Sequence, residues 1–431
     1  MNETGFREKI GWSRTIIIGF QHVLTMCPGT IAVPLILAAA LGLSAKDTAF
    51  FISANFFTSG IAILIQTLGV GKLAGSKYPI ILGSSFAPLS PMILIGQQYG
   101  LATLFGAIIA SGIIIFFLSF FMDHILKLFP PVVVGTFVTL IGVSLAPTAL
   151  RDLAGGEGSA TFGAPSNLLL GLAVLLLIIF IEKYAKGIWQ SMSLLIGIIV
   201  GTAVGVVCHM VDITPIVQAE TFRPVLPFAY GLPEFRLGPI LIMTLFCIIN
   251  MIQCIGVFSV MDEIVGIHTD AQAKERGIRG QALAQVLAGT FNSVPSTMFN
   301  ENVSLIGLTK VKNRSVIVAA GIMMILAGVC PKLSAIITAV PKCVMGGATL
   351  ALFGVITSSG ISMLSRLDFS KDNNFKIVGT SIAIGVGACF ASDAFVGVPQ
   401  SLSMVLSNGL FMVSVSAILL NLLLNGRKAF A

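Results

Sequence analysis

Residues 299–310 read FNENVSLIGLTK and place one acid and two amides inside a strongly apolar part of the chain. Glu301 stands between Asn300 and Asn302, and apolar runs precede and follow this segment. A carboxylate accepts hydrogen bonds from N–H groups, whereas an amide offers both donors and an acceptor. This combination suits the recognition of a small polar solute that carries N–H and C=O groups on its edge.

Polar side chains also interrupt two other apolar stretches. GFQHVLTMCPGT contains Gln21 and His22, and a lone histidine in such a helix is commonly a structural hydrogen-bonding residue. CIINMIQCIGVFSVMDE contains Asn250 and Gln253, which lie three residues apart and so share one face of a helix. An amide at that depth needs a partner, which is either another helix or a ligand.

The elements that position these residues must be helices that cross a membrane. Of the 431 residues, 56% are hydrophobic and 10% are charged, against about 25% charged in a soluble domain. The mean hydropathy is +0.99, and apolar runs of about 20 residues recur along the chain, each long enough to cross a bilayer. A charge at the bilayer centre costs at least about 2.5–3.5 kcal/mol, so a deep Glu301 indicates function. No cleavable signal peptide is expected.

Fourteen hydrophobic segments are predicted, centred near residues 25, 57, 88, 110, 139, 174, 200, 248, 285, 303, 322, 353, 383 and 412. With both termini in the cytoplasm, 19 of the 25 basic residues fall in cytoplasmic segments and 6 in external loops. Cytoplasmic loops of membrane proteins carry such an excess of Lys and Arg. We therefore expect a multi-pass protein of the inner (cytoplasmic) membrane with both termini inside.

Two of these segments are unlike continuous helices. Residues 78–93 contain Pro88 and a polar pair that ends at Ser85, and residues 291–310 contain Pro295. Irregular backbone at membrane depth is tolerated only where it is buried in protein or lines a cavity. The two segments are the third and the tenth, which are equivalent positions in two repeats of seven. Paired interruptions of this kind point to a binding site near the middle of the membrane.

A glycine pattern supports the repeat. Gly135 and Gly142 of the fifth segment match Gly347 and Gly354 of the twelfth, each 212 residues further along the chain. Because each repeat has an odd number of spans, the two halves are expected to be inverted relative to each other.

At these residues the chain resembles the nucleobase–ascorbate transporter family, in its bacterial uracil/xanthine permease branch. The family signature is Gln, Glu or Pro, then Asn, any residue, Gly, four of any kind, Thr, and Arg, Lys or Gly. Residues 301–310 match every fixed position except the glycine, where Ser304 stands. The Gln21–His22 pair, the GSSFAP stretch and the MGG of the twelfth segment are also family features. The resemblance covers nearly the whole chain.

The resemblance implies a particular architecture. The fold would be an all-α membrane protein with 14 transmembrane segments in two inverted repeats of seven, and with short strands in the broken third and tenth spans. A core domain, residues 1–127 and 237–338, would carry the substrate. A gate domain, residues 128–236 and 339–431, would frame it during elevator-type alternating access, and a homodimer would form through the gate domain.

The resemblance also implies the site. The substrate-binding residues would be Glu301, Gln253, Phe86, Phe299, Asn300 and Gly29. The supporting or coupling residues would be His22, Asn302, Ser85 and Gln281. The implied ligand is a nucleobase, the implied coupling ion is H⁺, and neither a cofactor nor a metal is expected.

Besides Ser304, two positions of the implied ligand site depart from the family pattern. The family usually has Glu where this chain has Gln253, and many purine-selective members have Gln where this chain has Glu301. Uracil members carry Glu at both positions. A carboxylate favours a base with two N–H groups, and the Gln253 amide can meet both a carbonyl and an N–H. We therefore expect an oxopurine such as xanthine or guanine ahead of uracil, with adenine worse than either.

Three alternatives remain open at this point. The chain is a uracil permease of the same family, an anion carrier of the same architecture, or an intramembrane enzyme. An anion carrier would need a cationic or donor-rich site, which Glu301 opposes. An enzyme is not expected, because the four histidines are scattered and no HExxH or GxSxG motif is present. The seven cysteines form no CxxC pair, and the net charge of +7 fits loops facing anionic lipid rather than nucleic acid.

Overall fold

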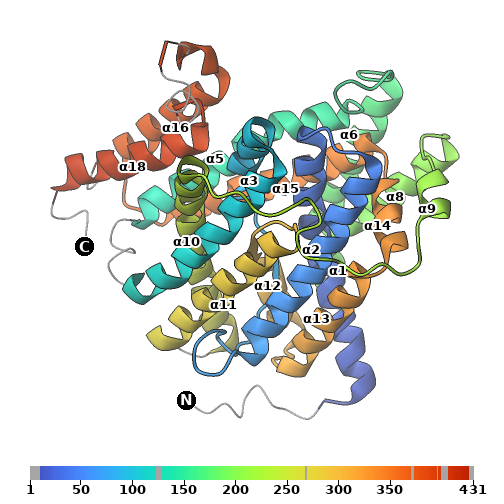
Figure 1. Ribbon diagram of the computed structural model, residues 1–431, viewed down its shortest axis with the longest axis horizontal. Helices are drawn as coiled ribbons and strands as arrows, with labels where there is room; N and C mark the ends of the chain where they lie inside the picture. The colour runs from blue at the N-terminus through green and yellow to red at the C-terminus, as the bar shows by residue number, and fades with distance from the viewer. Residues whose placement is uncertain are drawn as a thin grey trace.

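The computed structural model describes residues 10–122, 129–266, 269–369, 373–395, 397–398 and 406–426, and it is mostly helical (Figure 1). The helices are α1 (Trp12–Ala40), α2 (Ala45–Leu68), α3 (Leu89–Leu118), η2 (Ser119–Phe121), α5 (Pro131–Leu153), α6 (Pro165–Tyr184), α7 (Ile188–Ser191), α8 (Ser193–Val207), α9 (Thr214–Gln218), α10 (Leu237–Val265), α11 (Ala271–Thr290), α12 (Asn300–Thr309), α13 (Arg314–Gly328), α14 (Pro331–Thr338), α15 (Lys342–Ser365), α16 (Asn374–Phe390), η3 (Ser392–Phe395) and α18 (Gly409–Asn425). The strands are β1 (Leu82–Ser84) and β2 (Ser296–Met298).

Long apolar windows make this chain an integral multi-pass membrane protein. Within the described ranges, seven helices are long and apolar enough to cross a membrane, and α13 with α14, bent by 80°, makes an eighth if the pair is one span. Helices α8, α16 and α18 are shorter apolar helices. The count of fourteen spans and the inverted repeat stay predictions.

The two interrupted segments form short helices, each preceded by a strand. Helix α3 is broken at Gly100, which has a φ of 83°, a backbone conformation that glycine adopts readily. Residues 89–99 therefore form a separate short helix after β1. Helix α12 has ten residues and ends at Lys310, which has a left-handed conformation. Both half-helices therefore begin within the molecule, directly after a strand.

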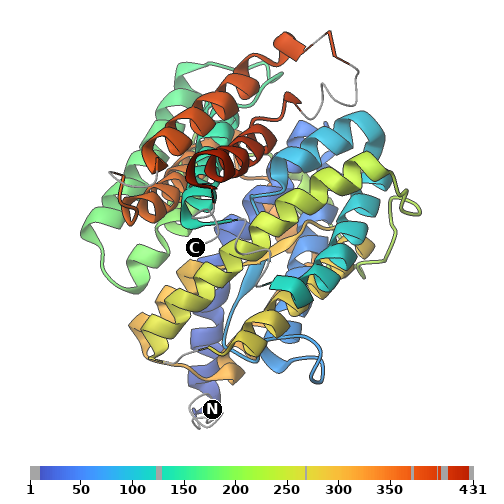
Figure 2. The same cartoon turned by 90° about the vertical axis from the view of Figure 1, so that its left-hand side faces the viewer.

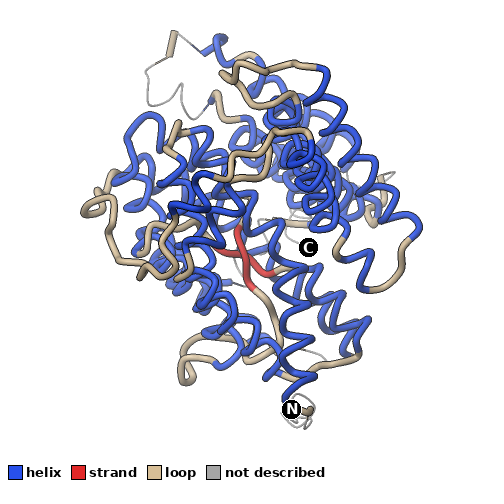
Figure 3. The backbone as a smooth tube through the Cα atoms, turned by 90° about the vertical axis from the view of Figure 1, so that its right-hand side faces the viewer, coloured by secondary structure: helices blue, strands red, loops and turns tan. Residues whose placement is uncertain are grey.

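The strands predicted in these two segments are present and pair with each other. They run antiparallel, with Gly83 opposite Thr297. The ladder continues at both ends, because the Ser85 N–H donates to the Pro295 carbonyl at 2.8 Å and the Phe299 N–H donates to the Ile81 carbonyl at 3.1 Å. Figure 3 shows the strands crossing in the middle of the molecule, surrounded by helices. This pairing satisfies backbone groups that a broken helix would otherwise leave unbonded inside the membrane.

The helices pack as two sets. Helices α1, α2 and α13 pack on one another, and α3 packs on α10 and α11. In the second set α5 packs on α15, α16 and α18, and α6 packs on α8 and α15. Figure 2 shows α16 and α18, in red, beside the green helices α6 and α8, with the blue, cyan and yellow helices on the other side. The boundaries of a core and a gate domain stay predictions.

Glycines allow α5 and α15 to cross closely. A Cβ atom at Gly142 would overlap the Thr357 hydroxyl and the Phe353 carbonyl, and a Cβ at Gly360 would overlap Thr139. Gly354 has no such neighbour within 4 Å. The reciprocal contact at this crossing thus involves Gly142 and Gly360. The match of Gly142 with Gly354, which concerns the expected repeat, stays a prediction. Sequence similarity between two glycine-rich helices does not fix which glycines face each other.

Candidate functional site

The α12 half-helix presents Glu301 on its exposed face. Phe299 is the residue before the helix, with extended backbone, and Asn300 and Glu301 form the first turn. The side chains of Asn300, Glu301 and Ser304 are exposed, whereas Asn302 is buried. The first N–H groups of a helix lack intrahelical acceptors and favour a negative group or a ligand acceptor nearby. Ser304, which replaces the signature glycine, lies one turn beyond Glu301 on the same face.

The Glu301 carboxylate makes no ion pair and no side-chain hydrogen bond with the part of the chain that the structure describes. Its charge is therefore not compensated by a neighbouring lysine or arginine there. A carboxylate in this state is available to bind N–H donors of a solute or to take up a proton.

Two aromatic rings meet a glycine beside this half-helix. A Cβ atom built on Gly29 of α1 would lie 3.2 Å from the Phe299 ring and 3.9 Å from the Phe86 ring. A Cβ atom on Gly83 of β1 would lie 2.7 Å from the Phe299 ring. Phe86 also contacts Phe353 of α15 edge-on, with the ring centroids 5.8 Å apart. Both rings are half-buried, so part of each is open to a planar molecule.

The two amides of α10 have separate roles in the structure. Asn250 is fully buried, accepts a hydrogen bond from the Ser85 hydroxyl at 3.0 Å and donates to the Ser296 carbonyl at 3.2 Å. It therefore holds both broken segments together. Gln253 is half-buried and its amide makes no hydrogen bond with the described residues, so it is free to meet a ligand. Helix α10 packs against α12, which carries Glu301.

Gln281 supports the strands indirectly. It is buried on α11 and accepts a hydrogen bond from the Cys254 thiol at 2.6 Å, and that sulfur lies 3.5 Å from the Thr297 hydroxyl of β2. The sequence did not single out Cys254 as more than a small buried hydrophobe. Its spacing of four from Asn250, on the face of α10 that meets β2, was the signal that could have found it.

His22 and Asn302 join α1 to α12. The Asn302 amide nitrogen lies 3.1 Å from His22 Nδ1 and donates to the His22 carbonyl at 2.9 Å. Both side chains are buried. Among the described residues, His22 Nε2 and Asn302 Oδ1 have no hydrogen-bond partner. These residues position the half-helix rather than face the exposed side where Glu301 lies.

A buried network on α2, which the sequence analysis did not find, holds the other side of the strands. The Asn55 amide donates to the Thr30 carbonyl and to the Ser84 hydroxyl, each at 2.7 Å. Its oxygen accepts from the Ser293 hydroxyl at 3.2 Å. No sequence motif marks Asn55, which is one of several polar residues of α2, among them Ser53, Thr58 and Gln66.

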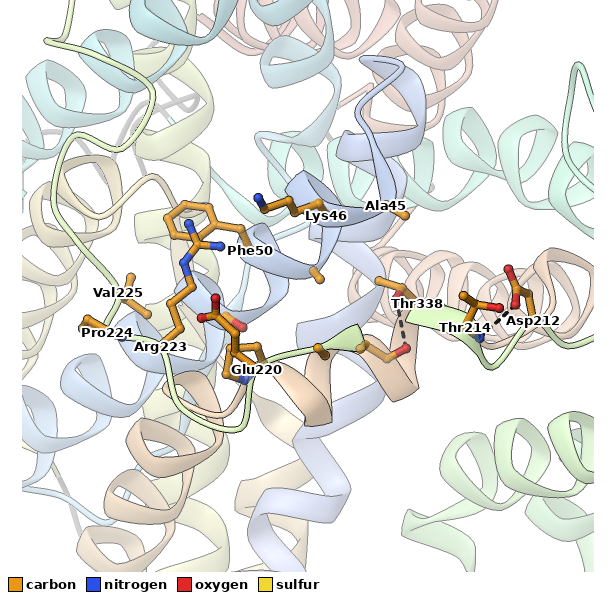
Figure 4. A pocket seen from close by; sticks show the side chains of 15 residues that line it. Ala45, Lys46, Phe50, Asp212, Thr214, Glu220, Arg223, Pro224, Val225 and Thr338 are labelled. Carbon is orange, nitrogen blue, oxygen red and sulfur yellow. Dashed lines mark hydrogen bonds between the residues drawn. The ribbon is translucent and has the colours of Figure 1, made fainter. Parts of the chain in front are cut away.

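A separate pocket of about 480 Å³ lies between α2, α14 and the connection from α8 to α10 (Figure 4). Its rim has both signs of charge, from Lys46 and Arg223 and from Asp212 and Glu220. The Arg223 guanidinium lies 5.8 Å from the Phe50 ring centroid. Hydrogen bonds from Thr214 hold the pKa of the Asp212 carboxyl below its usual range. None of the predicted site residues lines this pocket.

The sequence of the chain is similar to those of known transporters. A family model described as "Permease family" matches residues 13–394. The xanthine permease of Bacillus subtilis is 38% identical, covering 96% of this chain and 94% of the relative. The nucleobase transporter PlUacP of Paenibacillus larvae is 39% identical, covering 96% of each chain. The uric acid transporter UacT of Escherichia coli is 37% identical, covering 97% of this chain and 87% of the relative.

Solved structures show the same fold at low identity. The transmembrane domain of the cyanobacterial bicarbonate transporter BicA superposes with a TM-score of 0.56 at 14% identity, covering 97% of this chain and 99% of the other. Murine Slc26a9, an anion transporter solved in the inward-facing state, gives a TM-score of 0.64 at 12% identity, covering 97% of this chain and 69% of the other. These similarities concern the fold alone.

Proposed function

The chain belongs to the nucleobase–ascorbate transporter family of permeases, and from this premise we propose that it imports an oxopurine such as xanthine or guanine across the cytoplasmic membrane. The observation that carries the proposal is the exposed Glu301 carboxylate, which has no ion-pair partner among the described residues, at the start of a half-helix that follows Phe299. The permease relatives support a transporter rather than an enzyme.

The proposed site recognises a base by its edge and its faces. Glu301 accepts from two N–H groups, and the Gln253 amide meets a carbonyl and an N–H group. Phe299 and Phe86 cover the planar faces, and Gly29 leaves room for the Phe299 ring. A bound base that lacks the matching donors would cover the polar groups of Glu301 and Gln253 and leave them unpaired, which makes discrimination strong.

The relatives include transporters named for xanthine and for uric acid. The charge of Glu301 favours binding of xanthine over binding of urate, for the following reason. Uric acid loses a proton more readily than xanthine, so at neutral pH it is an anion. A carboxylate with no cation beside it disfavours an anionic ligand. We therefore place xanthine and guanine ahead of urate for this chain.

The proposal also includes coupling of transport to protons and movement of one set of helices against the other. Glu301 is the only acid among the proposed substrate-binding residues, so proton coupling would run through it. The set of helices that carries the strands, residues 1–127 and 237–338, would move as a core domain against residues 128–236 and 339–431. The fold shared with the anion transporters supports an arrangement of this kind. Both termini would be cytoplasmic, and a homodimer would form through the gate domain.

An anion carrier is the second candidate because the superposing structures are anion transporters. The Glu301 carboxylate opposes it, since an anion would meet a like charge at the start of α12. The xanthine-permease and nucleobase-transporter relatives match at 30–39% identity over nearly the whole chain, whereas these structures match at 12–14%. The oxopurine assignment is therefore retained.

Uptake of labelled xanthine into proteoliposomes tests the function. Unlabelled xanthine and guanine should compete best, uracil less well, and adenine and urate weakly. Sulfate and bicarbonate should not compete. If uracil competes tenfold better than every purine, which is about 1.4 kcal/mol in binding free energy, the purine assignment is wrong. If sulfate or bicarbonate competes and no base does, the chain is an anion carrier.

A further inference from the structure

A proline inside α1 leaves one backbone carbonyl of that helix without its usual donor. Pro34 has no N–H group, so it cannot donate to the carbonyl of Thr30, four residues earlier. Thr30 is fully buried and follows Gly29, the glycine that lies against the Phe299 ring. A buried carbonyl without a donor costs free energy, so a donor must come from another part of the molecule.

Two side chains from other elements supply that donor. The Asn55 amide of α2 donates to the Thr30 carbonyl at 2.7 Å, and the Ser84 hydroxyl of β1 donates to the same oxygen at 3.1 Å. The Asn55 amide also donates to the Ser84 oxygen at 2.7 Å. Helices α1 and α2 and strand β1 therefore meet at one backbone atom beside the proposed ligand site.

The oxygen of the Asn55 side chain connects this group to the second strand. It accepts from the hydroxyl of Ser293, three residues before β2, at 3.2 Å, and the Thr58 hydroxyl of α2 donates to Ser293 at 2.8 Å. Asn55 is only 1% exposed, so solvent does not compete for these bonds. The amide nitrogen and the amide oxygen are both used, and together they link α1, β1 and the segment that leads to β2.

The close approach of β1 to α1 makes the relative position of these elements critical. A Cβ atom built on Gly83 of β1 would lie 2.6 Å from Thr30 Oγ1 and 2.7 Å from the Phe299 ring. Strand β1 thus lies directly against α1 and against the ring that is proposed to cover the base. A shift of Thr30 relative to β1 would change the gap between Gly29 and Phe299, and with it the space for a planar ligand.

We propose that Asn55 is a positioning residue that sets the base preference, acting through the Thr30 carbonyl that Pro34 leaves free. It holds Gly29 and β1 at a fixed distance from Phe299 rather than contacting the base. This inference rests on the proposed function, because base preference refers to the transported ligand.

Replacement of Asn55, with a buried amide elsewhere as the matched control, tests the proposal. The measurement is the ratio of the xanthine and uracil concentrations that halve uptake of labelled xanthine into proteoliposomes. Asn55→Ala should reduce the preference for xanthine over uracil about fivefold, the effect of roughly one net hydrogen bond. Gln285 of α11 is 2% exposed, and its amide donates to the Ile108 carbonyl and the Ser111 hydroxyl. Gln285→Ala should lower thermal stability to a similar extent and keep the preference, whereas an unchanged preference in folded Asn55→Ala would overturn the proposal.

A smaller change keeps the test valid if Asn55→Ala does not fold. Ser84→Ala removes one hydroxyl from the group around the Thr30 carbonyl and should reduce the preference in the same direction, by about two- to threefold. Ser53→Ala removes a comparably buried hydroxyl of α2, which pairs with the Ser334 hydroxyl of α14 at 2.8 Å, and should leave the preference unchanged. Equal effects of Ser84→Ala and Ser53→Ala would show a general loss of stability and overturn the proposal.

Hydrogen–deuterium exchange separates this inference from the proposed function, because it needs no substrate. The backbone N–H groups of Ser85 and Phe299 bond across the two broken segments. Their exchange should be faster in Asn55→Ala, or in Ser84→Ala if only that variant folds, and should be unchanged in Gln285→Ala. If the unmodified protein takes up no base, the proposed function fails while the exchange rates still test the positioning role. Unchanged exchange at both strands would overturn that role.

Discussion

Glu301 and Asn302 are sequence neighbours with opposite surroundings, and this contrast gives them different roles. Asn302 is buried and bonded to His22, so it fixes the half-helix on α1. Glu301 is exposed and makes no ion pair with any described residue. Successive side chains of a helix differ in direction by about 100°. Asn302 therefore points to α1 and positions the half-helix, whereas Glu301 points to the exposed side, where it can bind a ligand.

Replacement of the acid tests the recognition role. Glu301→Gln should weaken xanthine binding about tenfold or more, because a hydrogen bond to a charged group contributes roughly 1.5–3 kcal/mol and a neutral one about 0.5–1.5 kcal/mol. The measurement is competition against labelled xanthine in membranes that contain equal amounts of protein. Glu220→Gln, at an exposed acid on the α8–α10 connection, is the control and should bind normally. Unchanged affinity and unchanged base preference in Glu301→Gln would contradict the assignment.

Restoring the family acid on α10 tests the coupling role. Gln253 has no titrating group, so the pH dependence of uptake should follow one acid in the unmodified protein. Gln253→Glu adds a second carboxylate on a helix that packs against α12. Two interacting acids lose their protons in separate steps, so the pH profile of xanthine uptake should broaden and gain a second step. Superimposable profiles for the two proteins would exclude coupling through this pair of positions.

At the scale of elements, close helix contacts depend on which glycines face a neighbour. Gly142→Ala should lower the free energy of unfolding by about 1–3 kcal/mol, because the new methyl group overlaps Thr357 and the Phe353 carbonyl of α15. Gly354→Ala is the matched control within the crossing partner, since nothing lies within 4 Å of its Cβ position. Alanine there should be neutral or stabilising by up to about 1 kcal/mol. Thermal unfolding in detergent compares the two. Similar losses in both variants would argue against the reciprocal crossing.

At the scale of the whole molecule, transport by domain movement requires contacts that break during the cycle. The Asn408 amide before α18 donates to the Ser90 hydroxyl of α3 at 3.1 Å and so links the two sets of helices. A Ser90→Cys, Asn408→Cys double variant should form a disulfide under mild oxidation and lose nearly all xanthine uptake, while xanthine still binds. Reduction should restore uptake. Each single variant is a control for the native cysteines. Full uptake by the cross-linked protein would rule out relative movement at this contact.

The sequence by itself determined the membrane class, the two broken segments and the family, and the family resemblance implied the short strands. Each depends on local or compositional signals: apolar length, proline and glycine inside a span, and a ten-residue motif. The sequence also placed Glu301 and Asn302 on α12 and predicted that Asn250 needs a partner, because polar residues are conspicuous in an apolar chain.

Only the tertiary structure decided how these residues meet. Pairing of β1 with β2 joins segments more than 200 residues apart, so the union of Ser85, Asn250 and Ser296 has no local sequence signal. The contribution of Asn55 likewise had no sequence signal, since a buried polar partner is defined by three-dimensional neighbours, and Cys254 had only its spacing from Asn250 on α10. The same reason explains why no sequence pattern showed that Gly142 faces Thr357. Helical periodicity gives the face of a helix, and packing selects its partner.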